Sequence, residues 1–353
     1  MPPAIRRRIG GGASSRASPK VLSVEFMLQN HADIISIIIV CIAVGLIFEP
    51  TSRYSSRFVN LHHNSTDPLI ARETNLPMLY NYGLNDMFAI FFYGLVCLVT
   101  HGVIHQYLID RVTRKLHLSR IKHAKFHESG QLLAFYVISL IWAIELLRRE
   151  HLTSLSALWA NYPVEHRDMT YGFKLFYIIQ IGYWVHYIPQ VYLQLLQKMP
   201  REQMAPRLSY AATYIFFIAA AYLLNFTRLT LCLLFVHYIA EATFHISRLL
   251  YFSQREDLST KTFKLWSVLF IASRLVSITL SVLAFGFGLA QQESANHSPF
   301  VDGNFNCLFI RSFCLGATCS LQAGLLWRFI VFHLKRRREQ QVAVVGKKQR
   351  KNR

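Results

Sequence analysis

The stretch Phe263 to Ala290, FKLWSVLFIASRLVSITLSVLAFGFGLA, decides the fold class of this chain. It runs for 28 residues with only two charged side chains, Lys264 and Arg274. A helix needs roughly 20 mainly apolar residues to cross about 30 Å of hydrocarbon, so this stretch is long enough to span a bilayer. The sequence therefore predicts a transmembrane helix here.

Seven further apolar runs divide the chain in the same way. Apolar residues make up 53% of the 353 residues and charged residues 16%, whereas roughly a quarter of a soluble domain is charged. We therefore expect an all-α polytopic membrane bundle of about eight transmembrane helices. The first run is the weakest, because its 15 residues span fully only if Val24 to Leu28 extend the helix; otherwise it lies in the interface. The seven runs are Ile34 to Phe48, Leu84 to Ile109, Gln131 to Leu147, Phe173 to Leu196, Leu208 to Leu224, Leu229 to Ile246 and Leu308 to Leu334.

The Lys and Arg residues outside the runs fall mainly in alternate gaps. Residues 335–353 hold nine of them, whereas residues 291–307 hold none. An excess of Lys and Arg on the short loops of one side marks the cytosolic face, so both termini are expected in the cytosol. The net charge of +19 reflects 38 Lys and Arg residues against 19 Asp and Glu residues, and the basic ends are candidates for contact with anionic lipid headgroups or the ribosome.

Two features fall in loops assigned to the luminal side. Asn64-Ser65-Thr66 is an acceptor sequence for N-glycosylation and predicts modification of Asn64. In the loop of residues 148–172, Leu152, Leu155, Leu158 and Trp159 recur at helical spacing. That spacing favours an amphipathic helix lying on the luminal surface.

Ionisable side chains at membrane depth are costly and usually face a partner or a cavity. The densest set is His237, Glu241 and His245, with Arg248 just beyond, and spacings of four place the first three on one stripe of a helix. Two imidazoles and a carboxylate are common zinc ligands, so a metal or acid–base site is one interpretation. An interhelical hydrogen-bond network that fixes packing is the favoured one, because no H-E-x-x-H motif is present. No metal, cofactor or catalytic residue is assigned.

Four more polar residues lie inside or near the ends of runs. His101 and His105 are four apart and share a helix face. Lys174 and Arg328 lie near run ends, and we expect both side chains to extend toward the headgroups.

Charged residues of opposite sign also occur on different runs. Glu145 and Glu241 are candidate partners for Arg274 and Arg311, and the sequence does not assign the pairs. A polar interior shared by several helices is compatible with a cavity for water or lipid headgroups.

Five segments resemble the translocating chain-associated membrane protein family, and the similarity extends from about residue 20 to about residue 338. The resemblance implies a non-enzymatic polytopic protein of the endoplasmic reticulum membrane beside the Sec61 translocon. Its implied partners are nascent secretory and membrane polypeptides with signal sequences, together with membrane lipids. The segments are Glu25 to Ile34 (EFMLQNHADI), His123 to Tyr136 (HAKFHESGQLLAFY), Leu234 to Phe252 (LFVHYIAEATFHISRLLYF), Phe285 to Ala290 (FGFGLA) and Gly303 to Asn306 (GNFN).

The same resemblance implies a division of the chain around a TLC domain, the helical fold shared with ceramide synthases. Residues 118–327 would form this domain from the third to the eighth helix. Residues 28–117 would supply the first two helices and the glycosylated luminal loop. Residues 1–27 and 328–353 would be a cytosolic basic tail and the end of the last helix with a second basic tail.

Ceramide synthases use an adjacent His pair in one helix and two Asp residues in another. The corresponding helix here, Leu208 to Leu224, has no histidine, and the adjacent pair His62-His63 lies in a loop. Ala211 and Ala212 cannot supply a general base, so an acyltransferase is the less favoured alternative, beside a lipid-binding or lipid-transport protein.

Overall fold

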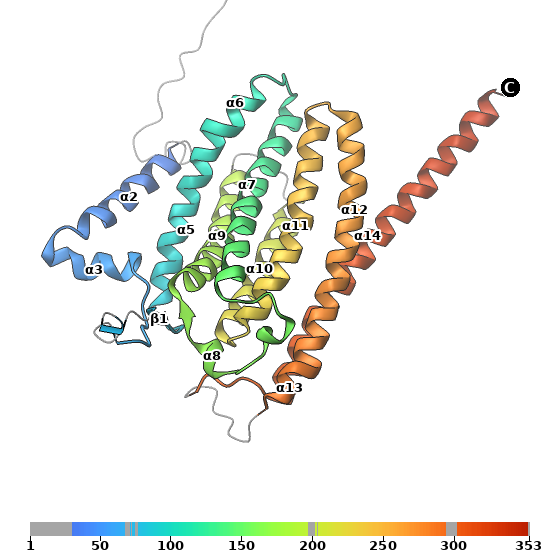
Figure 1. Ribbon diagram of the computed structural model, residues 1–353. Helices are drawn as coiled ribbons and strands as arrows, with labels where there is room; N and C mark the ends of the chain where they lie inside the picture. Colours follow the sequence, from blue (N-terminus) through green and yellow to red (C-terminus); the bar gives the residue numbers. More distant parts are fainter. Residues whose placement is uncertain are drawn as a thin grey trace, which may run out of the picture.

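The computed structural model describes residues 30–351 except 68–70, 72, 75–76, 197–201, 203 and 294–301. Within these residues the chain is a bundle of long helices with one small two-stranded antiparallel sheet (Figure 1), which confirms the expected all-α membrane fold. The elements are α2 His31–Gly45, α3 Glu49–Val59, β1 Leu79–Tyr80, α5 Asp86–Val103, η1 Ile104–Ile109, α6 Asp110–Thr113, α7 Arg120–Arg149, η2 Leu155–Leu158, α8 Val164–Arg167, β2 Met169–Thr170, α9 Tyr171–Leu196, α10 Met204–Leu223, α11 Thr227–Phe252, α12 Glu256–Ser281, η4 Val282–Gly288, α13 Leu289–Gln291 and α14 Leu308–Lys351.

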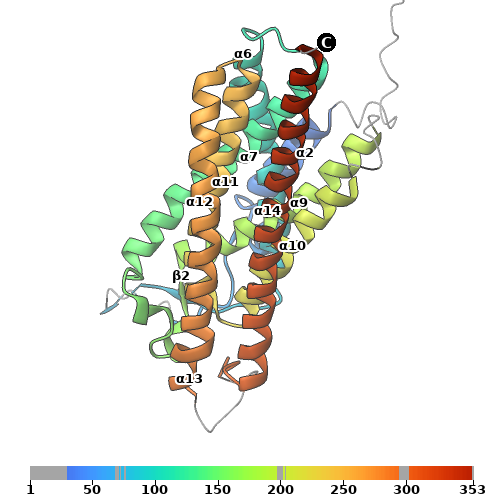
Figure 2. The same ribbon diagram turned by 90° about the vertical axis from the view of Figure 1, so that its right-hand side faces the viewer.

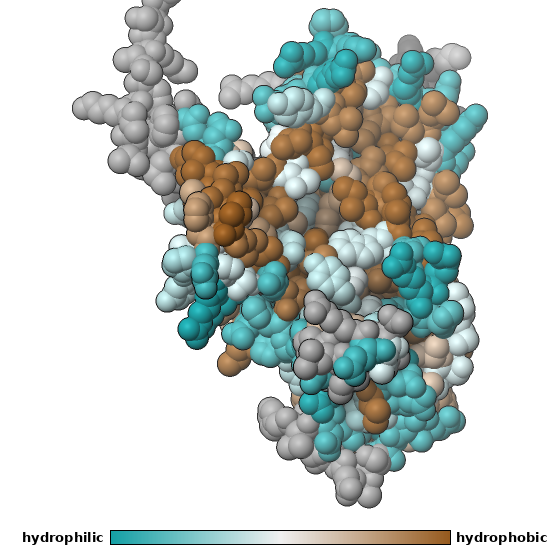
Figure 3. All heavy atoms as spheres, turned by 60° about the vertical axis from the view of Figure 1, so that its left-hand side comes forward, coloured by the Kyte–Doolittle hydropathy of each residue, from teal (hydrophilic) through white to brown (hydrophobic). Residues whose placement is uncertain are grey.

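The helices pack as two groups. In the first group α9 lies between α5 and α10, and in the second α11 lies between α7 and α12, with α14 on the outer side of α12. Apolar side chains gather across the middle of the face in Figure 3 and hydrophilic ones gather at both ends, as a protein seated in a bilayer requires. We call these ends of the bundle the α6 end and the α8 end (Figure 1).

Five helical segments of the described chain are long and apolar enough to cross a membrane. The runs at Phe173 to Leu196 and Leu208 to Leu224 form α9 and α10, which have spanning length but are not among those five. Both carry several tyrosines, and α9 also carries polar side chains, which lowers their hydropathy. The count of eight crossings stays a prediction. The five segments are Asp86–Thr113, Ile121–Arg149, Thr227–Phe252, Glu256–Gln291 and Leu308–Glu339.

The first run forms α2, and none of its side chains is buried. Fifteen residues extend about 22 Å as a helix, and α2 is inclined beside the bundle rather than parallel to it (Figure 1). Val24 to Leu28, which would lengthen it, lie outside the described residues. The start of α2 and the end of α14 both lie toward the α6 end (Figure 1), and the cytosolic location of the termini stays a prediction.

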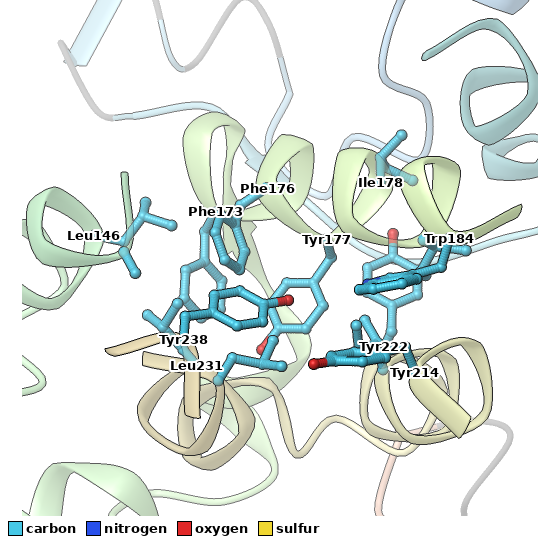
Figure 4. Close-up of a cluster of buried hydrophobic side chains, with 14 of the residues drawn as sticks. Leu146, Phe173, Phe176, Tyr177, Ile178, Trp184, Tyr214, Tyr222, Leu231 and Tyr238 are labelled. Carbon is cyan, nitrogen blue, oxygen red and sulfur yellow. The ribbon is translucent and has the colours of Figure 1, made fainter. Parts of the chain in front are cut away.

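The core lies around α9, whose side chains interlock with both groups of helices (Figure 4). Trp184 stacks on Tyr214 of α10 with ring centroids 3.9 Å apart, and Phe135 of α7 stacks on Tyr183 at 3.6 Å. Buried tyrosines also need partners for their hydroxyls, and Tyr238 of α11 donates to Gln180 at 2.7 Å. The core is therefore aromatic and hydrogen-bonded, which fixes the helices of the two groups in register.

The segment that follows α7 covers the α8 end of the bundle. Leu152 and Leu158 are buried in the main core, and the Tyr162 hydroxyl donates to the Leu224 carbonyl at 3.0 Å. Only the short η2 turn is helical around Leu155. The expected amphipathic surface helix is therefore wrong, because Leu152 and Leu158 fill the end of the bundle while Leu155 stays exposed.

Candidate functional site

A cavity of about 760 Å³ opens between α10, α11, α12 and α14. Figure 2 views the bundle from the side of α14, with α12 on one side of it and α10 on the other. The cavity walls are mostly apolar and include Phe216 of α10 with Phe309 and Phe313 of α14, all of them exposed. Its volume falls within the usual range for small-molecule sites, about 300–1,000 Å³.

The inner wall of the cavity carries a polar network centred on Arg274 of α12. The Arg274 guanidinium is buried and donates to Gln322 Oε1 of α14 at 2.9 Å. It also approaches His237 Nδ1 of α11 at 2.6 Å. The network therefore ties three helices together at the depth of the cavity.

The charge of Arg274 fixes the proton positions along the network. A guanidinium only donates, so His237 Nδ1 is the acceptor and Nε2 of the neutral ring carries the proton. That Nε2 lies within hydrogen-bond distance of the Tyr214 hydroxyl. Tyr214 lies 3.2 Å from the Tyr210 hydroxyl, which in turn donates to Glu241 Oε2 at 3.4 Å. A chain of donors thus runs from a cation to a carboxylate.

This arrangement limits the chemistry that the cavity supports. His237 has no unshared ring nitrogen, because Nδ1 accepts from Arg274 and Nε2 donates to Tyr214. A general base needs a free lone pair within reach of its substrate. The network is therefore suited to holding helices together and to presenting polar groups to a ligand, rather than to proton abstraction by this histidine.

His245, the third member of the predicted stripe, does not line the cavity. It is buried and stacks on Tyr136 with centroids 5.7 Å apart. Its neighbour Arg248 lies over the rings of Phe244 and Phe252 at 5.6 and 5.8 Å. The predicted stripe thus divides, with His237 and Glu241 joining Arg274 at the cavity and His245 packing in the core.

Of the pairs that the sequence left open, the structure brings together Glu241 and Arg274, whereas Glu145 and Arg311 have other partners. Glu145 pairs with Arg148 and Arg149 of its own helix, at an exposed position. Arg311 pairs with Glu293 at 2.9 Å near the α8 end. Glu241 interacts electrostatically with Arg274, and its carboxylate lies 3.9 Å from His237 Nδ1.

His101 and His105 do not act as one site. His101 Nε2 lies 2.6 Å from Gln190 Nε2 of α9, whereas His105 Nδ1 lies 3.6 Å from Asp110 Oδ2. The helix changes from α to π between them, at Ile104, which separates their directions.

The prediction for Lys174 is wrong. Its side chain is fully buried and forms an ion pair with Asp86 of α5, with Nζ 2.7 Å from Oδ1. Nζ also donates to the carbonyl oxygens of His62 and Asn81, and Tyr222 donates to Asp86 Oδ2. Position near the end of a run suggested a lipid-facing lysine, but the loop before α5 folds over it. Arg328, the other residue with that expectation, is exposed on α14 at the cavity.

Sequence reasoning missed Tyr210, Tyr214 and Gln322 at the cavity. The two tyrosines are four residues apart on a run that carries no ionisable acid, base or amide in its centre. That spacing was a usable signal for a polar stripe. Asn64, the predicted glycosylation residue, is exposed near β1, where its backbone bridges to Tyr80.

The fold and the cavity define a polytopic helical membrane protein with a ligand-sized opening toward lipid. The family model for the TLC domain matches residues 125–331, which overlaps the domain predicted at 118–327. The chain is 40% identical to human translocating chain-associated membrane protein 2 over 320 residues, 90% of this chain and 84% of the relative, and 38% identical to the mouse protein of that name over the same shares. The chain belongs to the translocating chain-associated membrane protein family, as its sequence segments suggested.

A more distant similarity points to the acyltransferase side of the superfamily. Sphingosine N-acyltransferase lac1 of Schizosaccharomyces pombe is 24% identical over 154 residues, which are 43% of this chain and 39% of that protein.

Proposed function

We propose that this protein is a non-enzymatic accessory of the protein-conducting channel of the endoplasmic reticulum, and that its cavity receives signal sequences or the lipids beside them. The names of its 38–40% identical relatives describe association with translocating chains. The single observation that carries the proposal is the cavity between α10 and α14, which joins apolar walls to a polar inner face.

Such a cavity would help segments that enter lipid poorly. A charged residue at the centre of a spanning helix costs about 3 kcal/mol on insertion scales. The Phe309 and Phe313 side of the cavity offers apolar contact, while Gln322 and Arg274 offer hydrogen bonds at the same depth. Signals of marginal hydrophobicity would therefore depend on this surface more than strongly apolar ones.

The proposed orientation places the α6 end in the cytosol. The exposed cations Arg111, Arg114 and Lys115 lie at that end, where they would face the ribosome or anionic headgroups. Asn64 would then lie in the lumen and carry a glycan. Contact with the Sec61 translocon follows from the same proposal.

An acyltransferase is the second candidate, favoured by the similarity to the yeast sphingosine N-acyltransferase. That activity would have to use the cavity without a histidine base, because both nitrogens of His237 are engaged. Turnover of acyl-CoA by the purified protein would support this candidate against the accessory role.

The proposal can be tested by photocrosslinking in microsomes that contain full-length protein. A photoreactive residue replaces Phe313 in the cavity wall or, as a control, Ile141 on α7, outside the cavity lining. The two side chains are 60% and 65% exposed, so the positions match in access to lipid. We expect adducts with a stalled nascent chain from position 313 and not from 141, and stronger adducts with weakly apolar signals. Equal labelling from both positions, or none from 313, would contradict the proposal.

A further inference from the structure

Three histidines and an aspartate meet at the α6 end, away from the cavity. His127 Nε2 of α7 lies 3.1 Å from Asp110 Oδ1, and His105 Nδ1 lies 3.6 Å from Asp110 Oδ2. His123 Nε2 lies 3.2 Å from His127 Nε2. Among the residues that the structure describes, His105, Asp110 and His127 form the group whose ligand atoms all lie within 4.8 Å of one another.

The backbone brings these side chains together through a π-helical segment. His105 and Asp110 are five residues apart, and residues five apart on an α-helix point in different directions. The i→i+5 hydrogen bonds of η1, Ile104–Ile109, instead stack each residue beneath the one five positions later. His123 and His127 are four apart on the first turns of α7 and share a face. Segments of π-helix are frequent at functional sites.

Hydrogen bonds alone do not pair all the ring nitrogens and carboxylate oxygens of this cluster. His127 Nε2 faces both a carboxylate oxygen and the Nε2 atom of His123, but a ring nitrogen carries at most one proton. The His127 side chain is only 8% exposed, so solvent gives this nitrogen little help. A cation at the centre would accept a lone pair from each ligand in place of this shared proton.

We propose that His105, Asp110 and His127 bind one divalent transition-metal ion of the zinc class, which leaves a fourth position for water. Neutral imidazoles and a carboxylate are the ligands that Zn²⁺ prefers with tetrahedral geometry. Bonds of about 2.0–2.1 Å require ligand atoms roughly 3.3 Å apart. This is close to the 3.1 and 3.6 Å that separate the nitrogens of His127 and His105 from the two carboxylate oxygens of Asp110. This departs from the sequence expectation of no metal and does not depend on the proposed function.

The metal would have a structural consequence. His105 and Asp110 precede residues 125–331, which match the TLC domain, whereas His127 lies inside them. A metal bound by all three would clamp the end of α5 to α7, and so would fix the first spanning helices against the TLC domain.

The test is metal binding by the full-length protein, purified in detergent and stripped with a chelator. Co²⁺ titration reports on tetrahedral coordination through its visible absorption, and Zn²⁺ is measured by competition. We expect one site per chain, weakened about 100-fold or more by His127→Gln or by the shape-conserving Asp110→Asn. His117→Asn removes an exposed histidine of the neighbouring loop and is expected to leave binding unchanged.

A second readout separates binding from folding. Zn²⁺ should raise the thermal unfolding midpoint of the unmodified chain and not that of Asp110→Asn, while both proteins unfold at similar temperatures in chelator. Equal binding by the unmodified chain and by the double variant His105→Gln/His127→Gln would overturn the proposal and leave the cluster as a hydrogen-bond network. An equal loss with His117→Asn would overturn it as well.

Discussion

The buried ion pair between Asp86 and Lys174 should make the α8 end sensitive to the loss of either charge alone. Both side chains are almost wholly buried, at 3% and 0% exposure, and their charged atoms lie 2.7 Å apart. Removing one partner of a buried pair costs about 3–5 kcal/mol, because the other charge stays buried without compensation. We therefore expect Asp86→Asn to lower the free energy of unfolding by about that amount. Replacing both charges, in Asp86→Asn/Lys174→Met, should cost less than Asp86→Asn alone.

Equilibrium unfolding in mixed detergent micelles, followed by the fluorescence of the buried Trp184 and its neighbours, measures these differences. Glu145→Gln is the matched control, since it also removes a carboxylate from an ion pair, but from an exposed one, and should leave the unfolding midpoint unchanged. A double variant less stable than Asp86→Asn would refute the reasoning, as would an unchanged midpoint for Asp86→Asn.

Three further outcomes follow from the structure. Gly182→Val should destabilise the protein by about 1–3 kcal/mol, because a Cβ at this position meets the Ile90 carbonyl oxygen at 3.0 Å. Gly316→Val should not, because a Cβ at Gly316 meets nothing within 4 Å, and thermal unfolding distinguishes the two variants. Arg274→Gln should cost about 1–3 kcal/mol in the same assay, because it leaves a buried acceptor unpaired. Burial lowers the pKa of His166 from 6.5 to about 3, so as the pH falls the unfolded chain takes up a proton before the folded chain does. The free energy of unfolding should therefore fall as the pH drops from about 6.5 toward 3. His166→Gln should flatten this pH dependence of the unfolding midpoint, and an unchanged slope would contradict the assignment.

The helices and the membrane class were predictable because apolar runs of about 20 residues are typical of spanning helices. Pairing between helices was not, because it depends on contacts between residues far apart in sequence. Lys174 illustrates this. Its position near the end of a run predicted a side chain that extends toward the headgroups, whereas Asp86, far earlier in the chain, holds it in the interior. His237 and Glu241 were found from spacing, but their partner Arg274 required the packing of α12 on α11.

Local departures from ideal helices account for other differences. His101 and His105 are four residues apart, and a regular α-helix would have kept them on one face. The π-helical segment η1 directs the His105 side chain toward Asp110 instead, and the residue types in Ile104–Ile109 give no sequence signal for a π-helix. Leu152 and Leu158 show the reverse case: they have helical spacing in the sequence but lie in the segment that follows α7, and both side chains are buried in the core.

The contrast between α9 and its neighbours has a consequence for how the chain is made. α9 is the central helix of the fold, yet its lysine, amides and tyrosines suit protein contact better than acyl chains. During synthesis it leaves the ribosome before α10 and α11, which later cover those groups, but after α5, which already carries the neutralising Asp86. The Asp86–Lys174 ion pair can therefore form only after α5, α7 and α9 have all been made. A protein proposed to assist marginal helices into the membrane thus contains one of its own.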